Sequence, residues 1–471
     1  MSAHLRAEPA EHESVTEAAL ARLEAMTFET FPDGLIAAAR MLVIDGIAVA
    51  VAGARLEEAP RILASHLRVQ GGSGDVSALG LGFGLSAVSA ALLNATSMHV
   101  LDYEPMWRPA THALSPVLAA ALALAEDREI DGRHLLTALV RGIEIQGWLR
   151  QAGVTESRDL RFHPPGVVGP IGAAIACGTL LGLDRTAMAN ALGMASSRCG
   201  ALFSNLGTMT KSTHCGYAAA SGLESVLLTA AGFSANTGIF DTREQGYLQA
   251  FMPTFDRSTF LQIGDTYRIL DPGFAIKIFP AKFSTHYGIT AALALHEAIG
   301  DPAAITRVEI VAADVPSSDR PSPKSGLDGK FSVQYTVAAA LLDGHVGLDT
   351  FTDRRLNRPD MQDLLPKITL SMPPEMPSLY NTGRYTEVVV HFAGREPISA
   401  RCSNPRGSWG AAPISTEEHT TKVRTCLSTY LSPGDVDEVV DLAARVETLD
   451  GASLRRLVRI AAGRPVAPQA A

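Results

Sequence analysis

Cysteine is scarce in this chain, and its few cysteines are not spaced as metal ligands or as a disulfide framework. There are five, an odd number, with none in a C-x-x-C spacing: Cys177, Cys199, Cys215, Cys402 and Cys426. Zinc ribbons and iron–sulfur clusters depend on such spacings, and secreted scaffolds on many paired cysteines. We therefore expect reduced cysteines in a cytoplasmic protein. The mixed acidic and polar N-terminal residues are not typical of a secretory signal.

Positive charge is also in short supply. The chain has 40 Lys and Arg against 49 Asp and Glu, which gives a formal net charge of −9, and no basic stripe is present. Nucleic acid is therefore not an expected partner. If so acidic a protein binds an anion, it must gather cations locally. This consideration directs the search to Lys, Arg and His inside otherwise apolar stretches.

Two long runs contain no Asp, Glu, Lys or Arg, namely Val76–Leu101 and Phe162–Leu183. Either is long enough to cross a bilayer. Both carry many glycines and polar or Pro residues, a composition that favours buried helices, so we expect no membrane segment. Aromatic residues are only 6% of the chain while Ala and Gly abound. Helices packed closely through small side chains fit this composition.

The chain is predicted to be almost wholly helical up to about residue 268, with no alternating strand pattern before residue 300. Asp131 and Asp184 are suitable helix N-caps. The predicted helices are Glu17–Ala25, Pro32–Ala54, Pro60–Gln70, Ser86–Thr96, Pro116–Glu126, Gly132–Gln151, Pro170–Leu181, Asp184–Gly193 and His214–Ala231.

The pattern changes after about residue 305. Apolar and polar residues alternate in Thr306–Ala312, Lys367–Met372 and Thr386–Phe392, which predicts strands. Helices are predicted for Thr285–Ala298 and Ser332–Asp343, and again from Ser415 to Ala462. The sequence thus predicts a mainly α fold: a large all-α helical domain of residues 1–270 plus 410–471, with an inserted smaller α+β lid domain of 272–405. Such an insertion favours a ligand cleft between the domains.

The stretch from His99 to Pro116, HVLDYEPMWRPATHALSP, separates two apolar helical segments. It carries Asp102, Glu104 and His112, and its prolines interrupt a regular helix. It is either a surface loop or the wall of a pocket, because loops positioned by rigid helices often carry function.

Three further polar islands interrupt apolar sequence: RFHPP (161–165), GTMTKSTH (207–214) and KIFPAKFSTH (277–286). They contribute three lysines and three histidines: Lys211, Lys277, Lys282, His163, His214 and His286. In the second island, Thr208, Thr210 and Ser212 are predicted to cap a helix that begins near His214, with its amides facing an anion. This composition suits a small polycarboxylate substrate. Each residue alone also has a structural interpretation as a cap, a turn or a solvated side chain.

At these islands the sequence resembles the MmgE/PrpD family over about residues 15 to 465. The motifs that carry the resemblance are NATSMHVLDYEPMWRPATH, FHPPGVVGPIGAA, GTMTKSTHCGYAAASG, KIFPAKFSTH and FSVQYTVAAALLDG. Members of the family include 2-methylcitrate dehydratases, cis-aconitate decarboxylases and iminodisuccinate epimerases, and WRPATH with RFHPP is most like the decarboxylases. The resemblance implies a helical domain with an α+β lid, a homodimer, and no metal or organic cofactor.

Carried over by motif, the catalytic residues are Asp102, His112, His163, Lys211, Lys277 and Tyr335. His214, His286 and Lys282 are added as substrate-binding residues. We expect His112 to act as the general acid/base, with Asp102 orienting it. Lys211 and Lys277 are expected to hold carboxylates of the substrate. His163 would hydrogen-bond the substrate or relay a proton, and Tyr335 would close over the ligand.

Some positions depart from the family pattern. Relatives commonly read D-F-D-D-T where this chain has Asp102-Tyr103-Glu104-Pro105-Met106, and Lys282 adds a cation. These changes leave the substrate open, and with it the choice between decarboxylation, dehydration and epimerisation. Two other classes also remain open: a non-catalytic carboxylate-binding paralogue and a helical scaffold. Gly80–Gly84 resembles half of a dinucleotide fingerprint but lacks a preceding strand and the βαβ frame.

Overall fold

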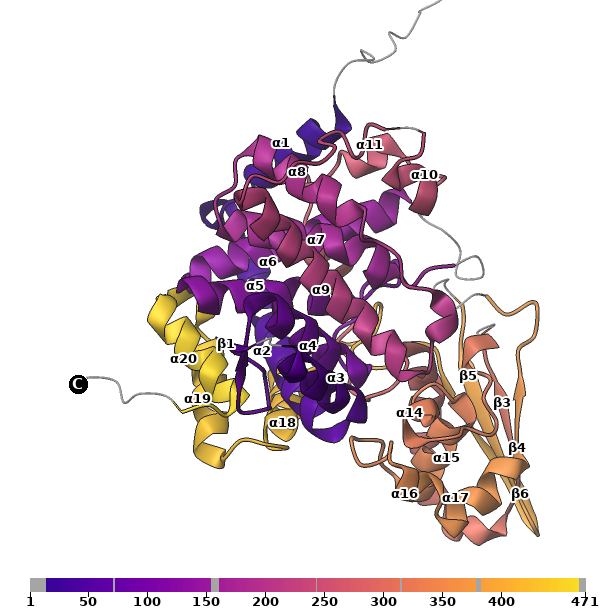
Figure 1. The fold of residues 1–471 in the computed structure, drawn as a ribbon. Helices are drawn as coiled ribbons and strands as arrows, with labels where there is room; N and C mark the ends of the chain where they lie inside the picture. The colour runs from indigo at the N-terminus through magenta and orange to yellow at the C-terminus, as the bar shows by residue number, and fades with distance from the viewer. Residues whose placement is uncertain are drawn as a thin grey trace, which may run out of the picture.

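The computed structural model describes residues 14–70, 73–153, 161–242, 244–313, 316–377 and 383–465. Helices dominate the first part of the chain (Figure 1). They are α1 (Val15–Glu24), α2 (Asp33–Leu56), α3 (Glu58–Val69), α4 (Ala87–Val100), α5 (Leu114–Arg128), α6 (Gly132–Ala152), α7 (Pro164–Leu180), α8 (Arg185–Ser196), α9 (Met209–Ala230), α10 (Tyr247–Phe251) and α11 (Arg257–Phe260). The prediction of a mainly α protein is confirmed.

The predicted helix starts at two aspartates are also confirmed. Asp131 accepts a hydrogen bond from the His134 amide and starts α6, and Asp184 accepts one from the Ala187 amide and starts α8. Each side chain thereby satisfies an amide that the helix itself leaves without a partner.

The expectation of no strand before residue 300 is wrong. A short antiparallel pair, β1 (Ser73–Ser77) and β2 (Gly84–Leu85), precedes α4. Its register is fixed from outside the pair, because the Glu126 carboxylate accepts hydrogen bonds from the amide and hydroxyl of Ser77. Two and five residues are too short for an alternating pattern to be recognised in sequence.

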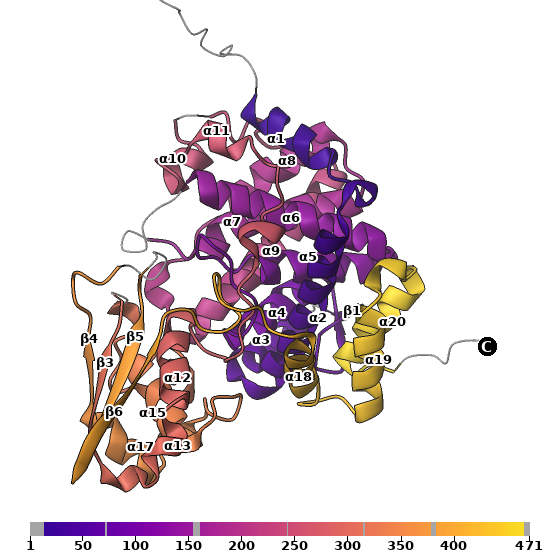
Figure 2. The same cartoon turned by 180° about the vertical axis from the view of Figure 1, so that it is seen from behind.

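The later part of the chain forms a four-stranded sheet in the order β4-β3-β5-β6, seen at the lower left of Figure 2. The strands are β3 (Ile305–Val311), β4 (Ile368–Ser371), β5 (Thr386–Phe392) and β6 (Arg395–Cys402), and only the β3–β4 pair is parallel. The helices of this part are α12 (His286–Leu293), α13 (His296–Ile299), α14 (Gly326–Gly329), α15 (Val333–Asp343), α16 (Asp353–Leu356) and α17 (Pro359–Leu364). Three of these strands agree with the prediction.

The fourth strand and one helix differ from it. β6 was missed because it is an exposed edge strand that contains Pro397, and edge strands tolerate proline and charge. The helix expected over Thr285–Ala298 is divided into α12 and α13. The break falls at Ala294 and Leu295.

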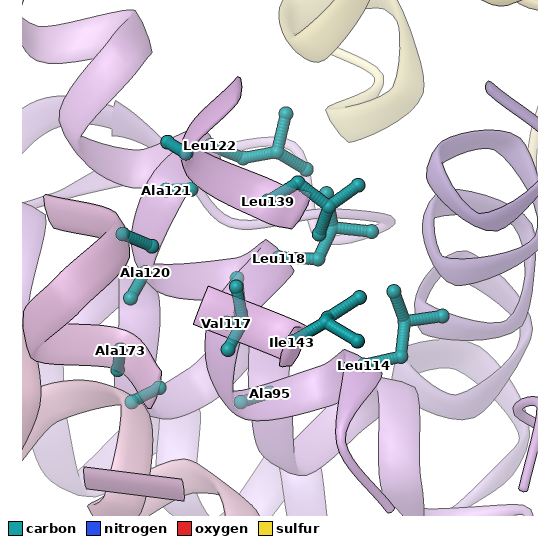
Figure 3. Packing of buried hydrophobic residues seen from close by; sticks show 14 of the residues in the cluster. Ala95, Leu114, Val117, Leu118, Ala120, Ala121, Leu122, Leu139, Ile143 and Ala173 are labelled. Atoms are coloured by element: carbon teal, nitrogen blue, oxygen red, sulfur yellow. The ribbon is translucent and has the colours of Figure 1, made fainter. Parts of the chain in front are cut away.

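Two separate hydrophobic clusters fill the molecule. The first runs from Val15 to Ile269 and is completed by α18 (Thr416–Leu427), α19 (Pro433–Ala443) and α20 (Gly451–Ala462). Figure 3 shows its centre, where Ala95, Ala120 and Ala173 let helices approach and leucines fill the space between them. The second cluster covers the β-sheet part, from Ala275 to Cys402, and takes in Met106. The division into domains at about 270 and 410 stays a prediction.

The two uncharged runs do not form bilayer-length helices. Val76–Leu101 holds strand, turn and α4, while Phe162–Leu183 holds α7, a buried helix of 17 residues. By length and composition α2 is apolar enough to cross a membrane, with 67% of its most apolar window buried inside the molecule. The buried core helix of a soluble protein passes the same test, so α2 is weak evidence for a membrane span.

Gly53 is predicted to be essential for the crossing of α2 and α4. A Cβ on Gly53 would lie 2.0 Å from the Ser97 carbonyl oxygen, whereas one on Gly34, in the same helix, would meet only Leu270 Cδ2 at 4.0 Å. Gly53→Ala should therefore lower the free energy of unfolding by about 1–3 kcal/mol. Gly34→Ala, the matched control, should raise it slightly, because Ala is the better helix former. Urea denaturation measures both, and equal midpoints for the two variants would contradict the prediction.

Candidate active site

The candidate site is built on the irregular segment between α4 and α5. Asp102 has a left-handed backbone conformation, with φ 51°, directly after α4 ends. An L-residue rarely adopts this conformation without support from its surroundings. The support comes from distant parts of the chain, since Lys277 Nζ donates to the Asp102 carbonyl at 2.7 Å and Lys422 Nζ, from α18, to the Tyr103 carbonyl at 3.0 Å. Lys422 also pairs with the buried Asp45 of α2 at 2.7 Å.

Two buried lysines meet on the Asp102 carboxylate. Lys211 Nζ lies 2.6 Å from Oδ2, and Lys277 donates to Oδ1. Burial alone would raise the pKa of Asp102, but Lys211 and Lys277 hold it well below its ordinary value. Burial lowers the pKa of Lys277, which the negative charge of Asp102 opposes. Two ammonium groups on one carboxylate concentrate positive charge at one point of a site shielded from water, where carboxylates of an anionic ligand can pair with them.

His112 lies beside this group and is 8% exposed. Its Nε2 is 3.9 Å from Asp102 Oδ1, and its Nδ1 is 3.3 Å from Glu104 Oε1 but outside hydrogen-bonding geometry. Burial lowers the pKa of His112, while Glu104 and Asp102 raise it in part. The imidazole is therefore neutral near pH 7 and able to accept a proton.

Glu104 and His99, to which the sequence motifs gave no role, both lie next to His112. Glu104 is fully buried; its Oε1 is 2.6 Å from His99 Nδ1, and its two oxygens accept from the hydroxyl and amide of Ser115. Burial raises the pKa of Glu104, but the two histidines outweigh this and keep it ionised. The sequence could have indicated His99 as a site residue, because it is a histidine within an apolar helical segment and lies three residues before Asp102.

A second pair of imidazoles adjoins the first. His163 precedes Pro164 at the start of α7, and its Nδ1 is 3.2 Å from His214 Nδ1. One of the two nitrogens must carry the hydrogen of this bond. Burial and the charge of Lys211 lower the pKa of both rings, that of His214 to about 4. Rings of His163 and His112 have centroids 6.0 Å apart, so the histidines form one contiguous group.

The prediction that a helix begins near His214 is wrong. α9 begins five residues earlier, at Met209, so Lys211 and His214 are inside the helix. Thr208 precedes the helix without capping it, and the Ser212 hydroxyl donates to the Met209 carbonyl. The cationic side chain of Lys211, rather than the free amides of a capped helix start at His214, therefore faces Asp102.

Tyr335 and His286, which the sequence motifs also predicted as site residues, lie outside the group of Asp102, the two lysines and the histidines. Tyr335 is in the second cluster, where its hydroxyl donates to the Thr350 carbonyl at 2.5 Å. His286 is packed between Phe279 and Phe283, with Nε2 3.2 Å from the Ala281 carbonyl oxygen. Among the residues that the structure describes, neither one hydrogen-bonds Asp102 or His112.

Lys282 is half-buried, and its Nζ donates to the Ser317 hydroxyl at 2.5 Å. Burial lowers the pKa of Lys282 to about 7. The charge of Asp102 opposes this shift, and the charges of Arg320, Lys211 and Lys277 add to it. Four cations therefore act on one region of a protein whose overall charge is negative. This is the local concentration of positive charge that an anionic ligand requires.

Three imidazoles have a spacing compatible with a metal ion, since ligand atoms of His99, His112 and His163 lie within 4.8 Å of one another. The ammonium groups of Lys211 and Lys277 beside them oppose the binding of another cation. We therefore do not assign them as metal ligands, and a metal-free site stays a prediction.

Taken together, these groups define a class of protein. A neutral buried imidazole and ammonium groups that neutralise carboxylates are what an enzyme needs to move a proton at a carbon beside a carboxylate. The family comparisons agree. The MmgE/PrpD N-terminal domain matches residues 20–259 and the MmgE/PrpD C-terminal domain matches residues 279–448. The chain belongs to the MmgE/PrpD family and is a lyase of that type.

Similar proteins include the cis-aconitate decarboxylase of Mus musculus, 30% identical over 97% of this chain and 95% of the mouse protein. The cis-aconitate decarboxylase of Homo sapiens is 34% identical over 78% of each chain. That of Aspergillus terreus is 26% identical over 89% of this chain and 91% of the fungal protein.

Lys282 is predicted to make polycarboxylate binding pH-dependent near neutrality. With a pKa of about 7, its ammonium group loses its charge as the pH rises from 6 to 8. The dissociation constant of a tricarboxylate such as tricarballylate should therefore rise up to about tenfold over this range. In Lys282→Arg, whose guanidinium stays charged, the rise should be largely absent. Calorimetric titration of both proteins at several pH values measures the dissociation constant. An equal dependence of this constant on pH in the two proteins would show that another group titrates.

Proposed function

We propose that this protein is a cofactor-free lyase that decarboxylates cis-aconitate, with His112 as general acid/base. The observation that carries the proposal is the convergence of Lys211 and Lys277 beside a buried neutral imidazole. The names of the similar mammalian and fungal proteins support the choice of substrate.

In the proposed reaction, Lys211 and Lys277 bind carboxylates of the substrate. The bond between one carboxylate and its carbon breaks, carbon dioxide leaves, and the electron pair remains on the carbon skeleton. Protonated His112 then donates a proton to carbon, and water restores the proton. A bound polyanion raises the pKa of His112, because opposite charge favours the imidazolium form. Substrate binding thus supplies the acid that the free site lacks.

The orienting role predicted for Asp102 fits Glu104 better. Glu104 faces His112 Nδ1 at 3.3 Å, whereas Asp102 is 3.9 Å from Nε2 and is engaged by two lysines. A carboxylate on Nδ1 leaves Nε2 available for the substrate. We assign Asp102 the task of holding the two ammonium groups in place until substrate carboxylates bind them.

The α+β part is proposed to act as a lid over this site. Contacts between the helical part and the β-sheet part lie around it: Lys277 on Asp102, the Tyr103 hydroxyl on the Ile278 carbonyl at 3.2 Å, and Lys211 over the Phe331 ring at 5.1 Å. A shift of the β-sheet part would move Lys277 and Phe331 relative to Asp102 and so open the site. The homodimer, the cytoplasmic location and a closing role for Tyr335 also stay predictions.

The reaction class is tested by proton NMR in D₂O with EDTA-treated protein. Cis-aconitate, 2-methylcitrate and iminodisuccinate are incubated separately. We expect loss of carbon dioxide from cis-aconitate, with deuterium in the product and no loss of activity after EDTA. A new alkene from 2-methylcitrate would indicate a dehydratase, and exchange at one carbon of iminodisuccinate an epimerase. If a tricarboxylate binds without any turnover, the non-catalytic paralogue suggested by Pro105 and Met106 is correct.

His112→Gln is predicted to lower kcat about 10²- to 10⁴-fold, the usual contribution of a general acid/base. His296→Gln is the matched control, because His296 is a half-buried histidine whose Nδ1 bonds the Leu341 carbonyl in the second cluster. Steady-state kinetics on cis-aconitate compare the two variants with wild type. Near wild-type turnover by His112→Gln would remove His112 from the mechanism.

A further inference from the structure

Two imidazoles share one oxygen of Glu104. Its Oε1 lies 2.6 Å from His99 Nδ1 and 3.3 Å from His112 Nδ1, and it also accepts from the Ser115 hydroxyl at 3.0 Å. An ionised carboxylate only accepts hydrogen bonds, so His99 donates its Nδ1–H. The weaker, misaligned contact with His112 is of a kind that often tightens when substrate binds.

The other ring nitrogen of His99 has no partner within the described part of the chain. Its Nε2 is buried and unsatisfied, and the residue is 1% exposed. A buried polar atom without a hydrogen bond destabilises the fold, so packing alone does not account for a histidine here. The missing partner of Nε2 decides which nitrogen of His99 carries the hydrogen. A proton on Nε2 would be left unbonded, whereas a proton on Nδ1 is bonded to Glu104, so His99 is fixed as a donor.

We propose that His99 is a positioning residue, which acts on the reaction through Glu104. By donating Nδ1–H, it holds the carboxylate in the orientation that keeps the hydrogen of His112 on Nδ1 and leaves His112 Nε2 facing the substrate. The two rings pack edge to face, with centroids 4.4 Å apart, which fixes them relative to one another. The inference rests on the proposed function in that it takes His112 as the general acid/base.

The geometry of the amide side chains provides a matched pair of variants. The amide nitrogen of Asn can take the place of a histidine Nδ1, whereas that of Gln extends to the place of Nε2. His99→Asn should retain the donor to Glu104 and keep kcat within about threefold of wild type. His99→Gln should lose it and lower kcat about 10- to 100-fold, the range found when a hydrogen-bond partner that orients a metal-ligating histidine is removed. KM should change less than about twofold in both, because His99 touches no substrate.

A purely structural role for His99 would give a different result. If packing were its only task, Asn and Gln would reduce kcat alike, or KM would rise as much as kcat falls. Either result would overturn the proposal. His99→Leu is a second negative variant if His99→Gln does not fold, and His296→Leu controls for the loss of a histidine elsewhere. Thermal unfolding of each protein shows whether a kinetic change follows from loss of structure.

A second measurement does not depend on turnover. Nitrogen NMR of the full chain labelled with ¹⁵N-histidine distinguishes protonated from unprotonated ring nitrogens, and His112→Gln identifies the His112 signals. We expect His112 to carry its hydrogen on Nδ1 in wild type and His99→Asn, and to distribute it over both nitrogens in His99→Gln. An unchanged tautomer in all three would overturn the inference. If wild type does not convert cis-aconitate, the proposed function fails, and this comparison alone decides the role of His99.

Discussion

The site depends on one buried carboxylate held between two ammonium groups. Asp102 pairs with Lys211 and opposes the loss of charge that burial favours in Lys277, and it does so from a left-handed backbone position. Removing one partner would leave an uncompensated buried charge, which is far more costly than the pair is stabilising. The segment between α4 and α5, the start of α9 and the residues before α12 are therefore tied to one another.

The same arrangement explains how an acidic protein can hold a polyanion. The positive charges that act on Lys282 come from Arg320, Lys211 and Lys277, which are far apart in the sequence and are brought together by the fold. Glu104 is engaged separately from the lysines, because its hydrogen bonds go to His99 and Ser115. Asp102 thus pairs with the lysines, whereas Glu104 contacts the histidines. Burial and the positive charge of Lys211 lower the pKa of each of these histidines and so favour the neutral imidazoles.

Much of this was accessible from the sequence. Helix periodicity, aspartate caps and small-residue composition predicted the helical body, and three strands followed from alternation. The edge strand Arg395–Cys402 and the pair β1–β2 were not predictable, because a proline-containing edge and a two-residue strand carry no clear pattern. The break between α12 and α13 was missed because the apolar pattern of the helix continues across it.

For the site, the sequence determined which residue types are present and in which motifs, and it pointed to Asp102, His112, His163, Lys211 and Lys277 as one functional group. It did not determine the partners within that group. Only the tertiary structure decided that Glu104 rather than Asp102 faces His112 Nδ1, that His99 shares this carboxylate, and that Tyr335 bonds a backbone carbonyl elsewhere. The physical reason is that a hydrogen bond depends on distances of a few ångströms between side chains from separate elements. Local sequence fixes helices and turns, whereas packing of distant segments fixes those distances.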